Sequence, residues 1–257
     1  MSLPEKVIII AAGQGRRCRP LTESVPKPLL QVNGRSVLEH QIDALTSNGI
    51  KEFVLIRGYK AEAFQRSDIR YYYNARYKEN NVLNSLMVAE TELDRDCLVS
   101  YGDIVYTSGV VKAAVQSTGD FVLMVDTAWR ERYVGRRLHP VSEAEKVIVD
   151  DRGMLRCIGK QIPDTESVYG EFIGVARLTA HGCKLIRHTF HSVKSQLDGG
   201  PFQEARTFQE ACLSDLFQEM VDLGHSIHTV PIEGNWVEID TIEDYEYAIK
   251  VFNSDGR

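Results

Sequence analysis

Cysteine is scarce in this 257-residue chain, and the five that occur are scattered singly. Their number is odd and no Cys-x-x-Cys pair is present, so the sequence predicts neither a disulfide framework nor a zinc site. Long apolar runs are also missing. The run near the start, residues 7–12, is too short for a signal-peptide core and far shorter than a membrane span. We therefore expect a reduced, cytoplasmic protein with no membrane partner.

A basic stripe is absent as well. The chain has 30 basic and 36 acidic residues and a net charge of −6, so no overall field attracts nucleic acid, and we expect no nucleic-acid partner. Repeats and low-complexity tracts are not found. With 43% hydrophobic and 26% charged residues, the composition is that of an ordinary globular protein with a sizeable core.

Short apolar runs alternate with helical patterns through the first half of the chain. This alternation predicts an α/β fold, Rossmann-like, with a mostly parallel central sheet and helices on both faces. A capping box at Ser36 and Glu39 starts one helix, and Gly49 closes it. The expected strands are 7–12, 53–57, 69–73, 97–101 and 121–125, and the expected helices are 37–48 and 82–93.

The pattern changes after about residue 128. Two short strands, 147–149 and 154–158, flank an Asp-Asp-Arg-Gly turn and predict a hairpin. Thr241 followed by Asp244 caps a last helix. We predict one domain, residues 1–257, whose second half supplies a lobe. The other expected elements there are strands 171–177, 227–232 and 237–239, and helices 180–197 and 208–223.

A glycine-rich segment, AAGQGRRCRP at residues 11–20, follows the first strand directly. Glycines let backbone amides approach an anion, and clustered arginines neutralise its charge. The segment is not a dinucleotide fingerprint, because Cys18 replaces the third glycine, and no Lys-Ser or Lys-Thr pair completes a Walker A loop. On this pattern alone, an anion-binding loop and a purely structural turn are equally compatible.

The next segment favours the anion-binding loop. Pro26 and Pro28 make the chain stiff and extended on either side of Lys27. A lysine held in this way can reach the same anion as the arginines. The alternative is a solvated surface lysine in a proline turn.

Together the two segments resemble the sugar-nucleotidyltransferase superfamily, whose signature is Gly-x-Gly-(Thr/Ser)-Arg, a proline, then Pro-Lys-x-Leu. The resemblance implies that Arg17 and Lys27 are catalytic. Two positions depart from the signature, since Arg16 replaces a small hydroxyl residue and Cys18 replaces leucine. The matching positions are Gly13, Gly15, Arg17, Pro20, Pro26, Lys27 and Leu29. The expected nucleotide contacts in this region are Ala11, Ala12, Gly13, Gly15 and Arg16.

Two acidic positions stand at the ends of predicted strands. Asp103 ends a buried strand, and a carboxylate there points into the crevice where ligands bind. Asp240 follows a late short strand, and alternation places Glu238 on the same side. Asp240 could instead cap the helix that follows it. In the superfamily that the chain resembles, an aspartate at each of these places holds Mg²⁺, so the resemblance implies that Asp103 and Asp240 are the metal ligands.

An amide-rich stretch, residues 74–86, resembles a segment of the choline-phosphate cytidylyltransferases of the same superfamily. Amide and hydroxyl groups can read the edge of a base, so Asn81 and Ser85 are candidates for selecting cytosine. Helix capping by Asn80 or Asn81 is an equally good interpretation. The resemblance to cytidylyltransferases implies CTP as the donor.

The stretch 126–146 resembles the cytidylyltransferase domains that accompany phosphonate-making mutases. Its arginines, with two lysines, would suit a dianionic phosphonate, although each alone is typical of a solvated surface. Aromatic and acidic residues could instead receive a cationic, choline-like group, for which Trp129, Tyr133 and Glu171 are available. His139, His188 and His191 are interpreted as structural. The expected acceptor contacts are Trp129, Arg130, Lys146, Lys160 and Glu171.

These interpretations combine into one hypothesis, a Mg²⁺-dependent transfer of CMP from CTP to a small phosphonate or phosphate monoester, with release of pyrophosphate. Residues 1–128 would mainly bind the nucleotide, and residues 129–257 mainly the acceptor, together with the second metal aspartate. A homo-oligomer is compatible with the sequence. Two alternatives stay open, a hexose-1-phosphate nucleotidyltransferase that uses UTP or dTTP, and a nucleotide-binding regulator without catalysis.

Overall fold

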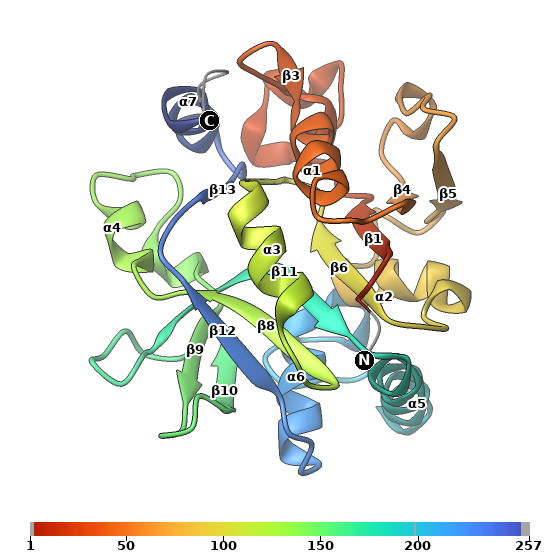
Figure 1. Cartoon of the computed structure of the whole chain (residues 1–257), viewed down its shortest axis with the longest axis vertical. Helices are drawn as coiled ribbons and strands as arrows, with labels where there is room; N and C mark the ends of the chain where they lie inside the picture. The colour runs from red at the N-terminus through yellow and green to blue at the C-terminus, as the bar shows by residue number, and fades with distance from the viewer. Residues whose placement is uncertain (1–2, 198, 253–257) are drawn as a thin grey trace.

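The structure is a computed structural model that describes residues 3–197 and 199–252. Within these residues, nine strands form one large sheet (Figure 1). Its strands are β1 (Lys6–Ala11), β4 (Glu52–Arg57), β5 (Ile69–Tyr73), β6 (Cys97–Tyr101), β8 (Phe121–Asp126), β9 (Lys146–Val149), β10 (Leu155–Gly159), β11 (Gly170–Leu178) and β12 (His228–Ile232).

The centre of the sheet is parallel. β1 lies between β6 and β4, and β5 follows β4, all in the same direction. β11 runs antiparallel and joins this half to the rest, because it pairs with β6, β8 and β9 along its length. A register shift near Gly174, whose φ is +78°, accompanies this change of partners. The hairpin of β9 and β10 and the parallel pair β8–β12 complete the sheet. The predicted α/β class and mostly parallel sheet are confirmed.

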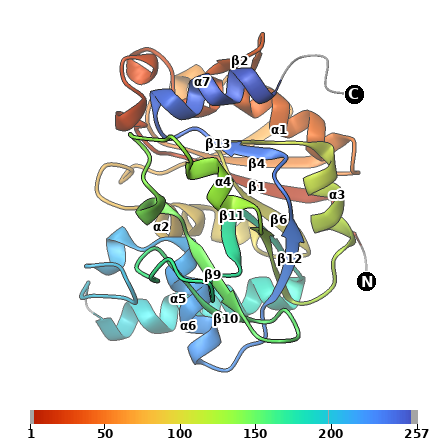
Figure 2. The ribbon, with the colours of Figure 1, turned by 90° about the vertical axis from the view of Figure 1, so that its left-hand side faces the viewer.

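Helices cover both faces of the sheet (Figures 1 and 2). Alternate residues of β1 explain this, since Val7 and Ile9 pack toward α1 and α3, whereas Ile8 and Ile10 pack toward α2, α5 and α6. None of the helices in the described ranges combines the length and apolar character of a membrane span. The helices are α1 (Val37–Thr46), α2 (Val82–Leu86), α3 (Ser108–Gln116), α4 (Trp129–Tyr133), α5 (Ala180–Leu197), α6 (Leu213–Asp222) and α7 (Ile242–Val251).

Two small strand pairs lie apart from the large sheet. They are β2 (Gln31–Val32) with β3 (Arg35–Ser36), and β7 (Ile104–Tyr106) with β13 (Trp236–Glu238). A small apolar core holds the second pair against the N-terminal segment and α7, and it includes Cys18, Val105 and Ile239. Segments more than 200 residues apart in sequence therefore meet at one end of the molecule.

The predicted strands and capping boxes match the structure closely, but two predicted helices are shorter. Residues 82–93 form α2 and then a 3-10 helix (Met87–Glu92), and residues 208–223 form a 3-10 turn (Phe208–Glu210) followed by α6. The two segments pair with each other, because the Asn81 and Leu83 amides donate to the Gln209 and Ala211 carbonyls. These contacts pair the Gln209 and Ala211 carbonyls, which a helix that began at residue 208 would have paired internally, with amides at the start of α2 that no helix pairs.

Candidate active site

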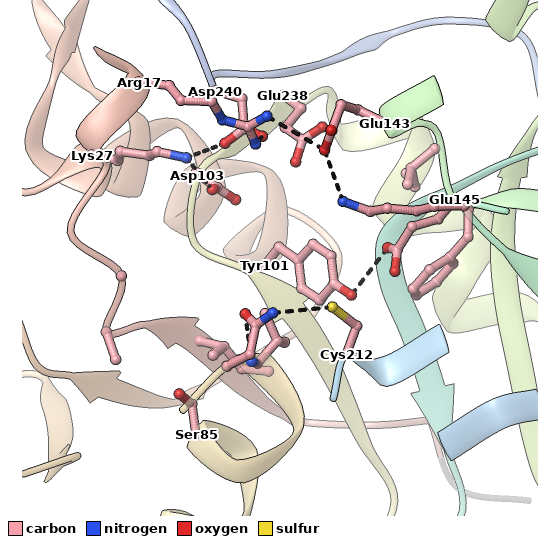
Figure 3. Close-up of a pocket in the computed structure, with 18 of the residues that line it drawn as sticks. Arg17, Lys27, Ser85, Tyr101, Asp103, Glu143, Glu145, Cys212, Glu238 and Asp240 are labelled. Carbon is pink, nitrogen blue, oxygen red and sulfur yellow. Dashed lines mark hydrogen bonds and ion pairs between the residues drawn. The ribbon is translucent and has the colours of Figure 1, made fainter. Parts of the chain in front are cut away.

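A cavity lies at the carboxyl ends of β1 and β6, where an open α/β sheet is expected to bind its ligand. Its volume is about 280 Å³. Figure 3 shows charged side chains gathered at one end, including Lys27, Asp103 and Asp240, and Ser85 at the other end, with Tyr101 between them. Both halves of the chain contribute to the lining, so the fold brings most of the predicted residues into one place.

Lys27 lies at the centre of the charged end. Pro26 is extended and Pro28 lies in the first turn of the short 3-10 helix that Lys27 begins, so the backbone fixes where the lysine stem starts. The ammonium donates to Asp103 Oδ2 at 2.8 Å and also to Asp240 Oδ1. Burial alone would lower the pKa of Lys27, but these two carboxylates raise it above its ordinary value. Lys27 is therefore a fixed cation in the cavity, and only 12% of its side chain is exposed.

Asp103 and Asp240 meet because β7 pairs with β13. Asp103 directly precedes β7, and its carbonyl accepts a hydrogen bond of 2.8 Å from the Ile239 amide. Asp240 does not cap the last helix. Thr241 is the N-cap and forms a capping box with Asp244, which leaves the Asp240 carboxylate free to face the cavity. The alternative of Asp240 as helix cap is thus wrong.

A chain of ion pairs runs across the charged end of the cavity. Arg17 contacts Asp240 and, at 3.4 Å, Glu143, which in turn lies 3.2 Å from Lys160 (Figure 3). Burial would raise the pKa of Asp240, but Lys27 and Arg17 hold it below its ordinary value. Since Arg17 belongs to the glycine-rich segment and Lys160 follows β10, these ion pairs connect the two halves of the cavity.

Residues at the amide-rich end both cap α2 and line the cavity. Asn81 is the N-cap of α2 and accepts from the Val82 amide, so the capping interpretation is confirmed. Its side chain nevertheless lines the cavity, as do Asn80 and Ser85. The Ser85 hydroxyl accepts a hydrogen bond of 2.9 Å from the Asn74 side chain. This wall offers amide and hydroxyl groups without a net charge.

The remaining wall is acidic and aromatic. Glu171 accepts a 2.5 Å hydrogen bond from the Tyr133 hydroxyl at Oε1, and burial raises its pKa to about 7. Among the described residues, its buried Oε2 has no hydrogen-bond partner. Glu145 accepts from the Tyr101 and Ser214 hydroxyls, and burial raises its pKa as well. Six lining side chains are carboxylates and three are cations, so the cavity has spare negative charge.

Three of the expected acceptor contacts do not reach the cavity. Trp129 is fully buried, where it packs with Ala144 and Val168. Arg130 stacks on the outer face of that indole and pairs with Asp164 on the surface. Lys146 is 2% exposed and donates to the Lys160 carbonyl at 2.6 Å. The structure therefore does not bring these three side chains to the cavity, whereas Lys160 and Glu171 do line it.

Only some of the residues predicted in the glycine-rich segment reach the cavity. Ala12 and Gly13 line the cavity, but Ala11, Gly15 and Arg16 do not. Ala11 is buried in β1, and Arg16 is exposed and bonded to Gln14. Gly15 has φ +59°, and a Cβ built there would lie 2.8 Å from Lys27 Cγ. Its role is thus to leave room for the lysine stem in a left-handed turn.

Sequence reasoning assigned no role to several lining residues. Glu145 directly precedes Lys146, and strand alternation could have indicated that it faces the opposite way. Glu143 lies in the 3-10 helix Val141–Glu143, to which strand alternation does not apply. Cys212 and Trp236 gave no signal, because only the three-dimensional fold brings them to the cavity. The unassigned lining residues are Ile10, Tyr77, Asn80, Val82, Tyr101, Glu143, Glu145, Phe172, Ile173, Cys212, Trp236 and Glu238.

The carboxylates at the charged end fit a hard divalent cation. Asp103 and Asp240 both accept from one ammonium, so their oxygens are close enough to share a partner. Oxygen ligands of this kind are those that Mg²⁺ takes, usually one or two together with phosphate oxygens. Burial and the nearby Asp240 and Asp103 raise the pKa of Glu238 well above its ordinary value, which is a further sign of excess negative charge.

Residues 7–161 match the family model of the MobA-like NTP transferase domain. The chain is 25% identical over 254 residues to CTP:phosphoglutamine cytidylyltransferase of Campylobacter jejuni, covering 95% of this chain and 98% of the relative. It is 30% identical over 255 residues to a UTP–glucose-1-phosphate uridylyltransferase of Haloferax volcanii, covering 95% and 94%. It is 26% identical over 244 residues to 2-aminoethylphosphonate cytidylyltransferase of Lancefieldella rimae, covering 92% and 89%.

Among solved structures, the chain resembles the CTP:phosphocholine cytidylyltransferase of Streptococcus pneumoniae. The TM-score is 0.72 at 23% identity, and the match covers 96% of this chain and 99% of the other. At this level of identity the likeness concerns the fold, which extends over nearly the whole of both chains.

Proposed function

Because this chain belongs to the MobA-like NTP transferase family and is a nucleotidyltransferase, we propose that it transfers CMP from CTP to a small phosphonate or phosphate monoester and releases pyrophosphate. The observation that carries this proposal is the position of Lys27 between Asp103 and Asp240, with Arg17 beside them. Fixed cations next to paired carboxylates are the groups that a polyphosphate with its metal ion requires.

Asp103 and Asp240 would hold Mg²⁺, which when bound supplies positive charge next to the phosphate oxygens. Lys27 would stabilise the charge that develops on the α-phosphate, and Arg17 would stabilise the departing pyrophosphate. The backbone of Ala12 and Gly13 would lie along the triphosphate.

The bond changes require little acid–base chemistry. An acceptor oxyanion attacks the α-phosphorus in line and forms a new phosphorus–oxygen bond. The bond between the α-phosphorus and the oxygen that bridges it to the β-phosphorus breaks. The attacking oxygen is already ionised at neutral pH, so no general base is needed. The rate then depends on positioning and on neutralising charge.

The acceptor would bind at the acidic, aromatic wall. Glu145 and Glu171 face the cavity and have no ion-pair partner within the described residues, and Tyr101 and Phe172 lie beside them. A positively charged group on the acceptor suits this wall, whereas Lys160 can bind its phosphate or phosphonate. We therefore assign residues 1–128 mainly to the nucleotide and residues 129–257 mainly to the acceptor.

The neutral wall at Asn81 and Ser85 supports a pyrimidine base as the donor's nucleobase. Amide and hydroxyl groups can pair with the polar edge of cytosine, and two relatives that match along most of the chain are cytidylyltransferases. Mg²⁺, CTP and the small acceptor are thus the proposed partners of the site.

A hexose-1-phosphate nucleotidyltransferase is the second candidate. The similarity to the uridylyltransferase of Haloferax volcanii favours it, because at 30% that identity is higher than the 25% and 26% to the two cytidylyltransferases. The cations and aspartates of the site would serve either reaction. The unpaired Glu145 and Glu171 argue for a cationic acceptor instead of a neutral sugar.

One assay separates the two candidates. Pyrophosphate release is measured with Mg²⁺ and each of CTP, UTP and dTTP, against phosphocholine, 2-aminoethylphosphonate, an alkylphosphonate without an amine and glucose 1-phosphate. We expect turnover with CTP and an acceptor that bears an amine or quaternary ammonium group. Preferred turnover of glucose 1-phosphate with UTP or dTTP would establish the second candidate. Thermal stabilisation by CTP without pyrophosphate release would contradict both.

A further inference from the structure

Three possible metal ligands converge beside the Lys27 site. One ligand atom from each of His139, Glu238 and Asp240 lies within 4.8 Å of the other two. Glu238 ends β13, Asp240 precedes α7, and His139 belongs to the loop that follows α4. Figure 3 shows Glu238 next to Asp240 at the charged end of the cavity. Two segments, residues 238–240 and the loop that follows α4, thus bring a nitrogen and two carboxylates together.

The imidazole of His139 is oriented by a buried carboxylate. Its Nδ1 lies 2.8 Å from Asp244 Oδ2, and Asp244 also accepts from the Thr241 amide. Since the Asp244 carboxylate accepts, Nδ1 is the donor, and Nε2 is the ring nitrogen directed toward Glu238. A carboxylate that holds the far nitrogen in this way is the usual support of a metal-bound histidine.

The Nε2 atom and the Glu238 carboxylate lack partners. Nε2 lies 3.9 Å from Glu238 Oε2, which is too far for a hydrogen bond, although His139 is only 1% exposed. Within residues 3–197 and 199–252, neither group forms a hydrogen bond. The neighbouring cations Lys27 and Arg17 are bound to Asp240. Nε2 therefore faces the Glu238 carboxylate without a hydrogen bond between them, and a cation that bound both atoms would link the two groups.

We propose that His139, Glu238 and Asp240 form a divalent-cation site that selects a first-row transition metal ion over Mg²⁺. Imidazole nitrogen suits such ions, whereas Mg²⁺ prefers oxygen ligands. The site is distinct from the Asp103–Asp240 pair and shares one carboxylate with it. The two sites have only Asp240 in common, so the proposal of this second site rests on the proposed function only through that residue.

The site lies between Asp240 and the acidic wall. The His139 ring packs edge-on against Tyr133, with 5.7 Å between ring centroids, and the Tyr133 hydroxyl donates to Glu171. An ion held by His139 would thus add positive charge between the aspartate assigned to the nucleotide's metal and the glutamate assigned to the acceptor. It would bring the negatively charged end of an acceptor closer to the transferred phosphorus.

Co²⁺ alone is the probe, added to metal-free protein without nucleotide. Calorimetry gives its affinity, and proton NMR detects the Nδ1 proton of a cobalt-bound imidazole as a strongly shifted, exchangeable resonance. We expect the wild-type chain to show one such site. His139→Asn keeps a donor for Asp244 but removes Nε2, so it should weaken Co²⁺ binding at least ~10-fold, abolish the resonance and leave the Mg²⁺ affinity unchanged.

Three further variants complete the test. His191→Asn is the matched control, because His191 lies on the exposed side of α5 and pairs with Glu90. Glu238→Gln keeps the His139–Asp244 contact and should also weaken Co²⁺ binding, which covers the case that His139→Asn does not fold. Asp103→Asn should retain the Co²⁺ site, since Asp103 is not one of the three ligands.

Two results would overturn the inference. One is a Co²⁺ affinity in His139→Asn within about threefold of wild type, and the other is a wild-type complex without the shifted imidazole resonance. Either result, with Mg²⁺-dependent pyrophosphate release intact, would leave the proposed function standing. If the wild-type protein bound Co²⁺ through His139 but released no pyrophosphate with Mg²⁺, the proposed function would be contradicted instead.

Discussion

Lys27 donates a hydrogen bond of 2.8 Å to Asp103, a residue 76 positions later in the chain. The contact joins the stiff proline segment to the end of β6, and it places a buried cation where the proposed reaction develops negative charge. A surface lysine in a proline turn could not form it. The position of Lys27 therefore favours the interpretation as a catalytic cation over that of a solvated surface lysine.

We expect Lys27→Ala to lower turnover by roughly 10³-fold or more, by analogy with an arginine that stabilises phosphoryl transfer. The measurement is pyrophosphate release at saturating CTP and Mg²⁺. Lys51→Ala is a suitable control, because that lysine is exposed and pairs with Glu5 on the surface. If Lys27→Ala kept more than about a tenth of the turnover while Lys51→Ala was unaffected, the catalytic role would be excluded.

Gly13 and Gly15 should respond differently to alanine. A Cβ on Gly13 would meet no atom within 4 Å, so Gly13→Ala should keep its melting temperature. If the triphosphate approaches this backbone, the variant should still bind CTP several-fold more weakly. Calorimetric titration of CTP, with a thermal melt of the free protein, measures both. Unchanged CTP affinity would show that the nucleotide does not approach Gly13.

Gly15→Ala should instead affect the free protein. The left-handed backbone costs a non-glycine residue about 1 kcal/mol, and the added Cβ would press on the Lys27 stem at 2.8 Å. We expect lower stability and a displaced Lys27, with turnover reduced further than in Gly13→Ala. Urea unfolding and pyrophosphate release, measured on both variants, make the comparison. Equal stability of the two would contradict the steric explanation.

The pKa of Glu171, raised by burial to about 7, predicts how acceptor binding depends on pH. Only the ionised carboxylate attracts a cation, so KM for an amine-bearing acceptor should rise as pH falls below ~7. An alkylphosphonate without an amine is the control, because it presents no cation to the carboxylate. In Glu171→Gln the two acceptors should show the same pH profile. Identical profiles in the wild type would exclude this role.

The same residue gives a stability prediction of defined sign. The folded-state pKa of Glu171 lies above the ordinary value of 4.5, so its contribution to stability is full below pH 4.5 and is lost as pH rises through about 7. Glu171→Gln should therefore reduce the fall in unfolding free energy across this range. Urea titrations at several pH values measure the difference, and parallel curves for the two proteins would contradict it.

Asp126 should be the most sensitive buried charge outside the cavity. It is fully buried at the end of β8 and accepts from Arg132 Nε at 2.6 Å and from Trp236 Nε1 at 2.7 Å. Asp126→Ala leaves these donors without their acceptor, and we expect it to lower the unfolding free energy by about 3–5 kcal/mol. Urea unfolding measures the loss.

A surface pair provides the comparison for Asp126. Asp68 is half-exposed and pairs with Arg66 on the surface, so Asp68→Ala should change the unfolding free energy by less than about 1 kcal/mol. If the two alanine variants unfolded at the same urea concentration, Asp126 would stabilise the fold no more than a surface carboxylate does.

Local patterns were sufficient for much of the fold and part of the site. The strand periodicity, the capping box at Ser36 and the proline segment around Lys27 act within a few residues, so the sequence predicts them correctly. Trp129 was misplaced because burial depends on neighbours such as Val168, which local sequence does not reveal. The start of α6 was wrong for the same reason, since the Gln209 and Ala211 carbonyls before it bind the distant Asn81 and Leu83 amides. The end of α2 was wrong because the backbone leaves the helical conformation at Ala89.

The order in which residues reach the cavity follows from the pairing of β7 with β13. Lys27 and Asp103 belong to the first part of the chain, but Trp236, Glu238 and Asp240 become available only near its other end. During synthesis on a ribosome, the nascent polypeptide would expose Lys27 and Asp103 while Asp240, the second carboxylate partner of Lys27, is still untranslated. A nascent chain that ends at residue 161, as the family match does, would therefore lack the groups needed for turnover, and activity would begin only when the last strand has emerged and docked.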